Sequence, residues 1–217
     1  AFGGIVDHTG GALLCAGDPG LNRITKYIPQ LPASDFKGTT LYLRVTRDAE
    51  PRIVSPFYTP CLDALDRYEC HVGLSYQKII SEIAGIRTEV TIFVPPGEPV
   101  ELRDIRITNI GSDKARVDVI PVAEYSHFDA LKQFANADWV PQTMMSEAMR
   151  LDGGRIALLQ YPFMRKDGAV NFLSCSLPVD SFESDRRRFL GHKEYGTWRA
   201  PAALFEPSLS SYEALRG

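Results

Sequence analysis

YECHVGLSYQKI, GIRTEVTIFVPPGEPVELRDIRITN and ARVDVIPVAEY, which stand at residues 68–79, 85–109 and 115–125, decide the fold of this chain. In Asp-Ile-Arg-Ile-Thr, at 104–108, Ile105 and Ile107 fall on one face and the polar residues on the other. Such a two-residue period is typical of a strand with one buried side. Residues 116–119 repeat the pattern after a turn-rich spacer, which predicts a hairpin between the two runs.

A third run lies at 88–94, where β-branched residues are dense, and it stops at two consecutive prolines. Leu102 is out of register with the isoleucines that follow it, so we expect a β-bulge or a strand start near Arg103. The three runs together predict consecutive antiparallel strands.

Shorter runs of the same kind flank this region on both sides. Strands are predicted at 39–46, 53–60, 144–151, 155–161 and 169–176, with a short strand and turns within 1–20. Pro56 places the 53–60 segment near a sheet edge, and Asp152–Gly153 predicts a hairpin turn. Residues 181–198 are charged and are expected to be irregular. This spacing predicts an all-β protein, a large antiparallel β-sandwich over 1–200, followed at 201–217 by a linker that starts a helix.

The composition excludes several classes of protein. The 217 residues are 44% hydrophobic and 24% charged, which are ordinary values for a folded globular chain. With 24 basic and 27 acidic residues the net charge is −3, which argues against nucleic acid or an anionic membrane as the main partner. No apolar run approaches the roughly 20 residues that a membrane-spanning helix needs. The first residues show neither an initiating Met nor a signal peptide, so we expect a segment of a longer chain.

The four cysteines are Cys15, Cys61, Cys70 and Cys175. They lack the close paired spacing of a metal site, so we expect reduced thiols in a cytoplasmic protein and no metal.

Several blocks then resemble a known family. The segments RYECHVGLSY at 67–76, GIRTEVTIFVP at 85–95 and VELRDIRITN at 100–109 resemble the N-terminal domain of glycoside hydrolase family 94, once grouped as glycosyltransferase family 36. This family contains the cellobiose, cellodextrin and chitobiose phosphorylases. The blocks at 29–38 and 194–198 look most similar to the cellodextrin phosphorylase branch.

The resemblance implies a galactose-mutarotase-like "supersandwich", followed in the family by an α/α barrel that holds the active site. The implied reaction is inverting phosphorolysis of a β-linked gluco-oligosaccharide, in which one carboxylic acid protonates the departing oxygen and phosphate attacks the anomeric carbon. Inorganic phosphate is a co-substrate, and no cofactor is implied. The family also implies a homodimer.

The family's Asp-Trp-Asn-Asp-like catalytic motif is absent, and Asp138–Trp139 matches only two of its residues. We therefore expect no catalytic residue in this chain. A family loop that approaches the partner's active site corresponds to the irregular segment 126–143. Its substrate-binding candidates are Gln133, Asn136, Trp139 and Gln142. An indole can stack on a sugar ring and amides can bond hydroxyls. The alternative is that the aromatic residues only pin the loop to the sandwich.

Other interpretations remain open at this point. The chain can be a free-standing carbohydrate-binding sandwich without catalysis, or a mutarotase-like enzyme, although no His–carboxylate pair in the sequence indicates the second. Glu69 and His71 share a strand face and suggest an ordinary hydrogen bond or ion pair. The Asp185-Arg-Arg-Arg run is either a solvated or interdomain charge cluster or a phosphate site.

Overall fold

The computed structural model describes residues 1–47, 50–126, 144–163, 168–191 and 197–209. Its strands are β1 (Phe2–Val6), β2 (Ala12–Ala16), β3 (Thr39–Thr46), β4 (Pro51–Val54), β5 (Arg67–Val72), β6 (Tyr76–Ile83), β7 (Ile86–Phe93), β8 (Leu102–Asn109), β9 (Arg116–Ala123), β10 (Met144–Arg150), β11 (Ile156–Pro162) and β12 (Asn171–Ser174). The short helices are η2 (Asp152–Gly154), α2 (Arg186–Leu190) and η3 (Ala202–Phe205). The all-β prediction is confirmed.

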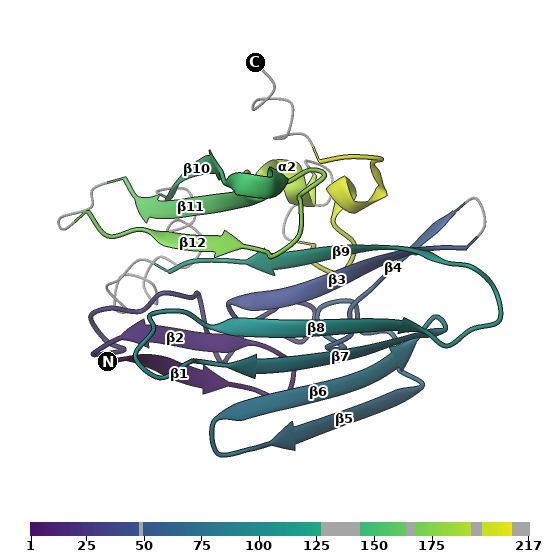
Figure 1. The fold of residues 1–217 in the computed structure, drawn as a ribbon, viewed down its shortest axis with the longest axis horizontal. Helices are drawn as coiled ribbons and strands as arrows, with labels where there is room; N and C mark the ends of the chain where they lie inside the picture. The colour runs from purple at the N-terminus through teal and green to yellow at the C-terminus, as the bar shows by residue number, and fades with distance from the viewer. Residues whose placement is uncertain (48–49, 127–143, 164–167, 192–196, 210–217) are drawn as a thin grey trace.

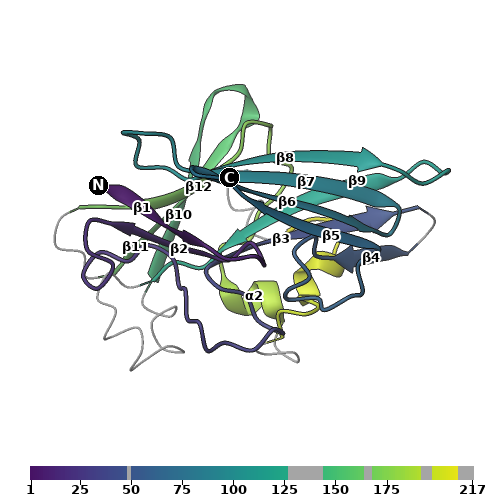
Figure 2. The same ribbon diagram turned by 90° about the horizontal axis from the view of Figure 1, so that it is seen from below.

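Every strand pair among the described residues is antiparallel. The sheets have the orders β5-β6-β7-β8, β4-β3-β9, β10-β11-β12 and β1-β2. The first two stack as a sandwich, and Figure 1 shows β3, β4 and β9 between the four-stranded sheet and the layer that holds α2. The view from below shows α2 beside β3 (Figure 2), and the two pack together through Tyr42, Phe189 and Leu190.

The central strand β3 is buried on both faces along most of its length, in keeping with its middle position in the sheet. Leu41, Leu43 and Val45 pack toward β6 and β7, in the core that the two stacked sheets share. Tyr42 points the other way, into a second core with the α2 and η3 segments. In a strand that is buried on both sides, burial does not alternate from one residue to the next. In β3 the residues from Thr39 to Leu43 are all buried.

The predicted hairpin between β8 and β9 is wrong. β9 leaves the four-stranded sheet and pairs with β3, from Thr39↔Ala123 to Thr46↔Arg116. Arg47, just after β3, holds the crossover: its guanidinium donates to the Asp113 carbonyl at 2.8 Å and to Asn109 Oδ1 at 3.0 Å. Pairing with β3 gives this buried strand a neighbour on its second edge. A hairpin between β8 and β9 would leave that edge of β3 unpaired.

Most of the remaining strand predictions are confirmed with small changes. The strand predicted at 53–60 is wrong beyond Val54, because β4 covers Pro51–Val54 and residues 55–60 form the loop that follows it. β8 starts at Leu102 and pairs with β7 without interruption down to Ile86↔Asn109, so a strand start, not a bulge, explains the change of register. β4 lies at the edge of its sheet, as Pro56 indicates. The first twenty residues form two paired strands, β1 and β2, one more than predicted.

The charged segment 181–198 contains the helix α2, which the sequence analysis did not predict. Asp185 caps this helix by accepting hydrogen bonds from the backbone N–H groups of Arg187 and Arg188, at 2.8 and 3.0 Å. Arg186 turns inward and reaches Glu124 Oε1 at 2.8 Å, while Arg187 and Arg188 are exposed. One residue of the charge run, Arg186, therefore forms an ion pair that joins α2 to Glu124, just after β9.

Candidate functional site

The four predicted substrate-binding residues, Gln133, Asn136, Trp139 and Gln142, all lie outside the described residues, so their role stays a prediction. The predicted linker at 201–217, which is expected to start a helix, is described only up to residue 209, and this part contains the short helix η3. The candidate site in the described part is a different one, to which the sequence analysis assigned no role.

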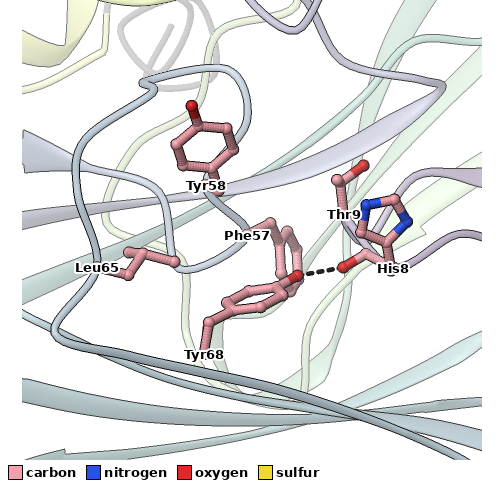
Figure 3. Close-up of a pocket in the computed structure, with 6 residues that line it drawn as sticks. All are labelled: His8, Thr9, Phe57, Tyr58, Leu65 and Tyr68. Atoms are coloured by element: carbon pink, nitrogen blue, oxygen red, sulfur yellow. Dashed lines mark hydrogen bonds between the residues drawn. The ribbon is translucent and has the colours of Figure 1, made fainter.

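Two adjoining hollows, of about 320 and 270 Å³, form this candidate site. We call it the Tyr58 groove, because Tyr58, His8 and Thr9 line both hollows. The remaining lining residues are Phe57, Leu65 and Tyr68 in the first hollow and Leu31, Pro32, Ala33, Asp35, Phe36, Lys37 and Thr59 in the second. Figure 3 shows Tyr58, Phe57 and Tyr68 on one side of the first hollow and His8 with Thr9 on the other. The two volumes together reach the lower range of small-molecule sites, about 300–1,000 Å³.

The loop that follows β4 presents Tyr58 to the groove. Ser55 Oγ donates to the Thr59 carbonyl at 2.7 Å and accepts from the Phe57 N–H at 3.2 Å. Thr40 Oγ1, from β3, donates to the same Thr59 carbonyl at 3.3 Å. Ser55, Phe57 and Thr59 are buried, whereas the Tyr58 side chain is 42% exposed. Tyr58 has a φ of 70°, in the left-handed region that bulky side chains rarely adopt.

The turn between β1 and β2 presents His8 and Thr9 from the opposite side. The Asp7 carboxylate accepts hydrogen bonds from the Thr9 N–H at 2.8 Å and the Gly11 N–H at 3.1 Å. The Tyr68 hydroxyl donates to the His8 carbonyl, and this bond joins the turn to β5 (Figure 3). Both walls of the groove are thus held by hydrogen bonds, so its shape is set before any ligand arrives.

Asp35 is the one carboxylate among the described lining residues of the groove. Burial raises its pKa above the ordinary value, although the hydrogen bond from the Phe36 N–H (2.7 Å) opposes this shift. The charges of Glu124, Lys26 and Arg186 act on it more weakly, the first raising and the others lowering the pKa.

Replacing Asp35 by Asn is expected to raise the Tm at pH 7 and to leave it unchanged at pH 3. Because the folded-state pKa is raised, the folded chain holds this proton more tightly than the unfolded chain does. The stabilisation is therefore present at low pH and is lost as the pH rises through the folded pKa. The amide oxygen of Asn still accepts from Phe36. Thermal unfolding of both proteins between pH 3 and 7 tests this, and an equal Tm difference at every pH would contradict it.

Glu69 and His71 form the predicted contact, a hydrogen bond with His71 Nε2 at 2.9 Å from Glu69 Oε2. The hydrogen bond from His71, followed by the one from Arg67, lowers the pKa of Glu69. Arg67 also reaches Glu82, so the pair is one end of a charge ladder across β5, β6 and β7. The residues are largely exposed and no groove-lining residue belongs to the ladder, which makes it a surface feature worth little in stability.

The cysteines are free, as expected: Cys61 is buried, Cys175 is exposed and Cys15 and Cys70 are intermediate. Burial raises the pKa of the Cys61 thiol to about 12, which makes it unreactive as a nucleophile. Within the described ranges, no three His, Cys, Asp or Glu side chains gather in a way that could hold a metal ion. Those ranges also contain no helix that is long and apolar enough to cross a membrane.

The stacked antiparallel sheets define a large β-sandwich domain. The family described as "Glycosyl hydrolase 94, supersandwich domain" matches residues 1–216, and the chain belongs to this family. The predicted family and supersandwich fold are therefore confirmed.

Among the relatives is N,N'-diacetylchitobiose phosphorylase of Vibrio furnissii, 27% identical over 192 residues, which cover 86% of this chain and 23% of that protein. Solabiose phosphorylase of Paenibacillus borealis is 25% identical over 185 residues, 82% of this chain and 22% of that protein. Cellobionic acid phosphorylase of Neurospora crassa is 25% identical over 173 residues, which cover 75% of this chain and 20% of that protein. The chain thus spans less than a quarter of the length of these relatives. None of the three is named for cellodextrin, so the cellodextrin branch stays a prediction.

Proposed function

We propose that this domain is the N-terminal β-sandwich part of an inverting β-glucan phosphorylase of the cellodextrin or cellobiose type. The parent enzyme transfers a glucosyl unit between a β-linked gluco-oligosaccharide and inorganic phosphate in the cytoplasm. The observation that carries the proposal is the family match over 1–216, together with three relatives that are all named phosphorylases. Under this proposal the general acid and the phosphate ligands belong to an α/α barrel domain of the parent chain.

The proposed role of the sandwich is to support that barrel and a homodimer. The open face of the β10-β11-β12 sheet favours a covering partner, because it exposes Met145, Met149 and Phe172, with Phe163 beside them. Apolar side chains gathered on one face are typical of an interaction surface. We assign this face to the barrel, since the relatives extend far beyond the matched region.

A second part of the proposal concerns the segment 126–143. Gln133, Asn136, Trp139 and Gln142 would form one wall of the acceptor site of the partner subunit, with the indole of Trp139 against a sugar ring. Their residue types and their place after β9 support this role.

The test uses the full-length parent protein, with phosphate release from α-glucose 1-phosphate and cello-oligosaccharide acceptors as the measurement. Full-length protein is expected to release phosphate, and residues 1–217 alone are not. Trp139→Ala is expected to raise the acceptor KM roughly tenfold with a smaller change in kcat, because a stacking contact is lost.

Two outcomes would contradict these proposals separately. A full-length protein that binds cello-oligosaccharides but releases no phosphate would favour the free-standing carbohydrate-binding interpretation. An unchanged acceptor KM in Trp139→Ala, for short and long acceptors alike, would reduce the 126–143 segment to scaffold.

A further inference from the structure

We propose that the Tyr58 groove is a second binding site for a β-linked gluco-oligosaccharide, with one pyranose ring against the face of Tyr58. This site is built entirely from described residues. The choice of β-linked glucose rests on the proposed function; the site itself rests on the geometry of the groove.

The first argument is the backbone conformation of Tyr58. A left-handed φ of 70° disfavours a bulky residue and would suit glycine, yet an aromatic ring stands there with 42% of its surface exposed. The hydrogen bonds of Ser55 and Thr40 to the Thr59 carbonyl hold the loop in this state. The ring contributes little to the core from this exposed position and is available for a contact with a ligand.

The second argument is the mixed character of the walls. Tyr58 and Leu65 supply apolar surface above the buried Phe57, with Pro32 and Ala33 continuing it into the second hollow. The rim carries hydrogen-bonding residues: His8, Asp35 and Thr9, whose hydroxyl donates to Asp7 Oδ1 at 2.7 Å and keeps only its acceptor capacity for a ligand. A sugar ring has the matching pattern, with apolar C–H faces and hydroxyl groups around its edge.

The third argument is the charge balance of the groove. Its described lysine, Lys37, lies 3.7 Å from Asp7 Oδ2 and 5.9 Å from the centre of the Tyr27 ring, so its charge is already engaged. Asp35 adds one carboxylate on the same side. No uncompensated cationic cluster is present among the described lining residues, as recognition of a phosphate or carboxylate ligand would require. A neutral ligand fits this balance.

The test is a titration of residues 1–217 with cellotetraose, followed by NMR or calorimetry, with maltotetraose as the α-linked comparison. The key variant is Tyr58→Gly, which removes the ring and at the same time relieves the left-handed backbone. Its dissociation constant for cellotetraose is expected to rise roughly tenfold or more, while its Tm does not fall. Tyr58→Phe keeps the ring and is expected to bind within a few-fold of the wild type.

Tyr76→Ala is the matched control, because Tyr76 is a similarly exposed tyrosine, on β6, that does not line the groove. It should bind as the wild type does. The proposal is overturned if the wild-type chain binds no cellotetraose, if maltotetraose binds equally well, or if Tyr58→Gly binds like the wild type. Binding is measured on the chain itself, so a full-length protein without phosphorylase activity would refute the proposed function and leave this site standing.

Discussion

Trp198→Ala is expected to lower the free energy of unfolding by about 3–5 kcal/mol, as large-to-small changes of buried aromatic residues do. Trp198 is 2% exposed and lies in the second core. Its ring meets Phe36 edge-on at a centroid distance of 4.7 Å and lies 5.9 Å from Phe189. The guanidinium of Arg186 stands 5.3 Å from the ring centre. The indole therefore packs between Phe36 and the α2 residue Phe189, and its removal opens a cavity that these partners cannot fill.

Trp198→Phe separates packing from polar effects in the same position. The indole Nε1 is buried and has no hydrogen-bond partner among the described residues, so the change to Phe removes this donor while keeping most of the aromatic contact. We expect Trp198→Phe to lower the free energy of unfolding clearly less than Trp198→Ala does. Urea unfolding gives both values. Equal losses for Phe and Ala would show that the indole's full width, not aromatic packing in general, holds this core.

The strands of this fold are largely predictable from the sequence because half-buried strands repeat every two residues. Ile105 and Ile107 show this period plainly, and β8 forms where it predicts. The path between strands is less predictable, because it depends on contacts made far away. Arg47 is 62 residues from Asn109, and no local pattern reveals that its guanidinium holds the crossover from β8 to β9.

The Tyr58 groove was missed for a similar reason. Pro56 and Pro60 mark a tight turn. The left-handed φ of Tyr58 goes with buried hydrogen bonds that Ser55 and Thr40 donate to the Thr59 carbonyl, and only the folded chain brings these residues together. The helix α2 was hidden because its five residues are too few to show a helical period. Asp185 was read as part of a charge run, although its position before the helix is that of an N-cap.

Glu124→Gln is expected to destabilise the domain by about 3 kcal/mol or more, because it leaves a buried ammonium group without its counter-charge. Glu124 Oε2 lies 3.1 Å from Lys26 Nζ, and its Oε1 lies 2.8 Å from Arg186 Nε. The Lys26 side chain is only 4% exposed, so water cannot replace the lost carboxylate. Arg186 is partly exposed and can be hydrated, which makes Lys26 the main source of the expected cost.

The double variant Lys26→Met with Glu124→Gln tests this reason directly. It removes the stranded charge and is expected to recover most of the lost stability, since a buried ion pair can be replaced by apolar residues at little cost. Lys78→Met is the control, because Lys78 and Glu89 form a closer pair, at 2.6 Å, whose side chains are 35% and 25% exposed. Lys78→Met should change the free energy of unfolding by no more than about 1 kcal/mol. If Glu124→Gln costs no more than this surface control, or if the double variant is as unstable as Glu124→Gln alone, the buried charge of Lys26 is not what makes Glu124 necessary.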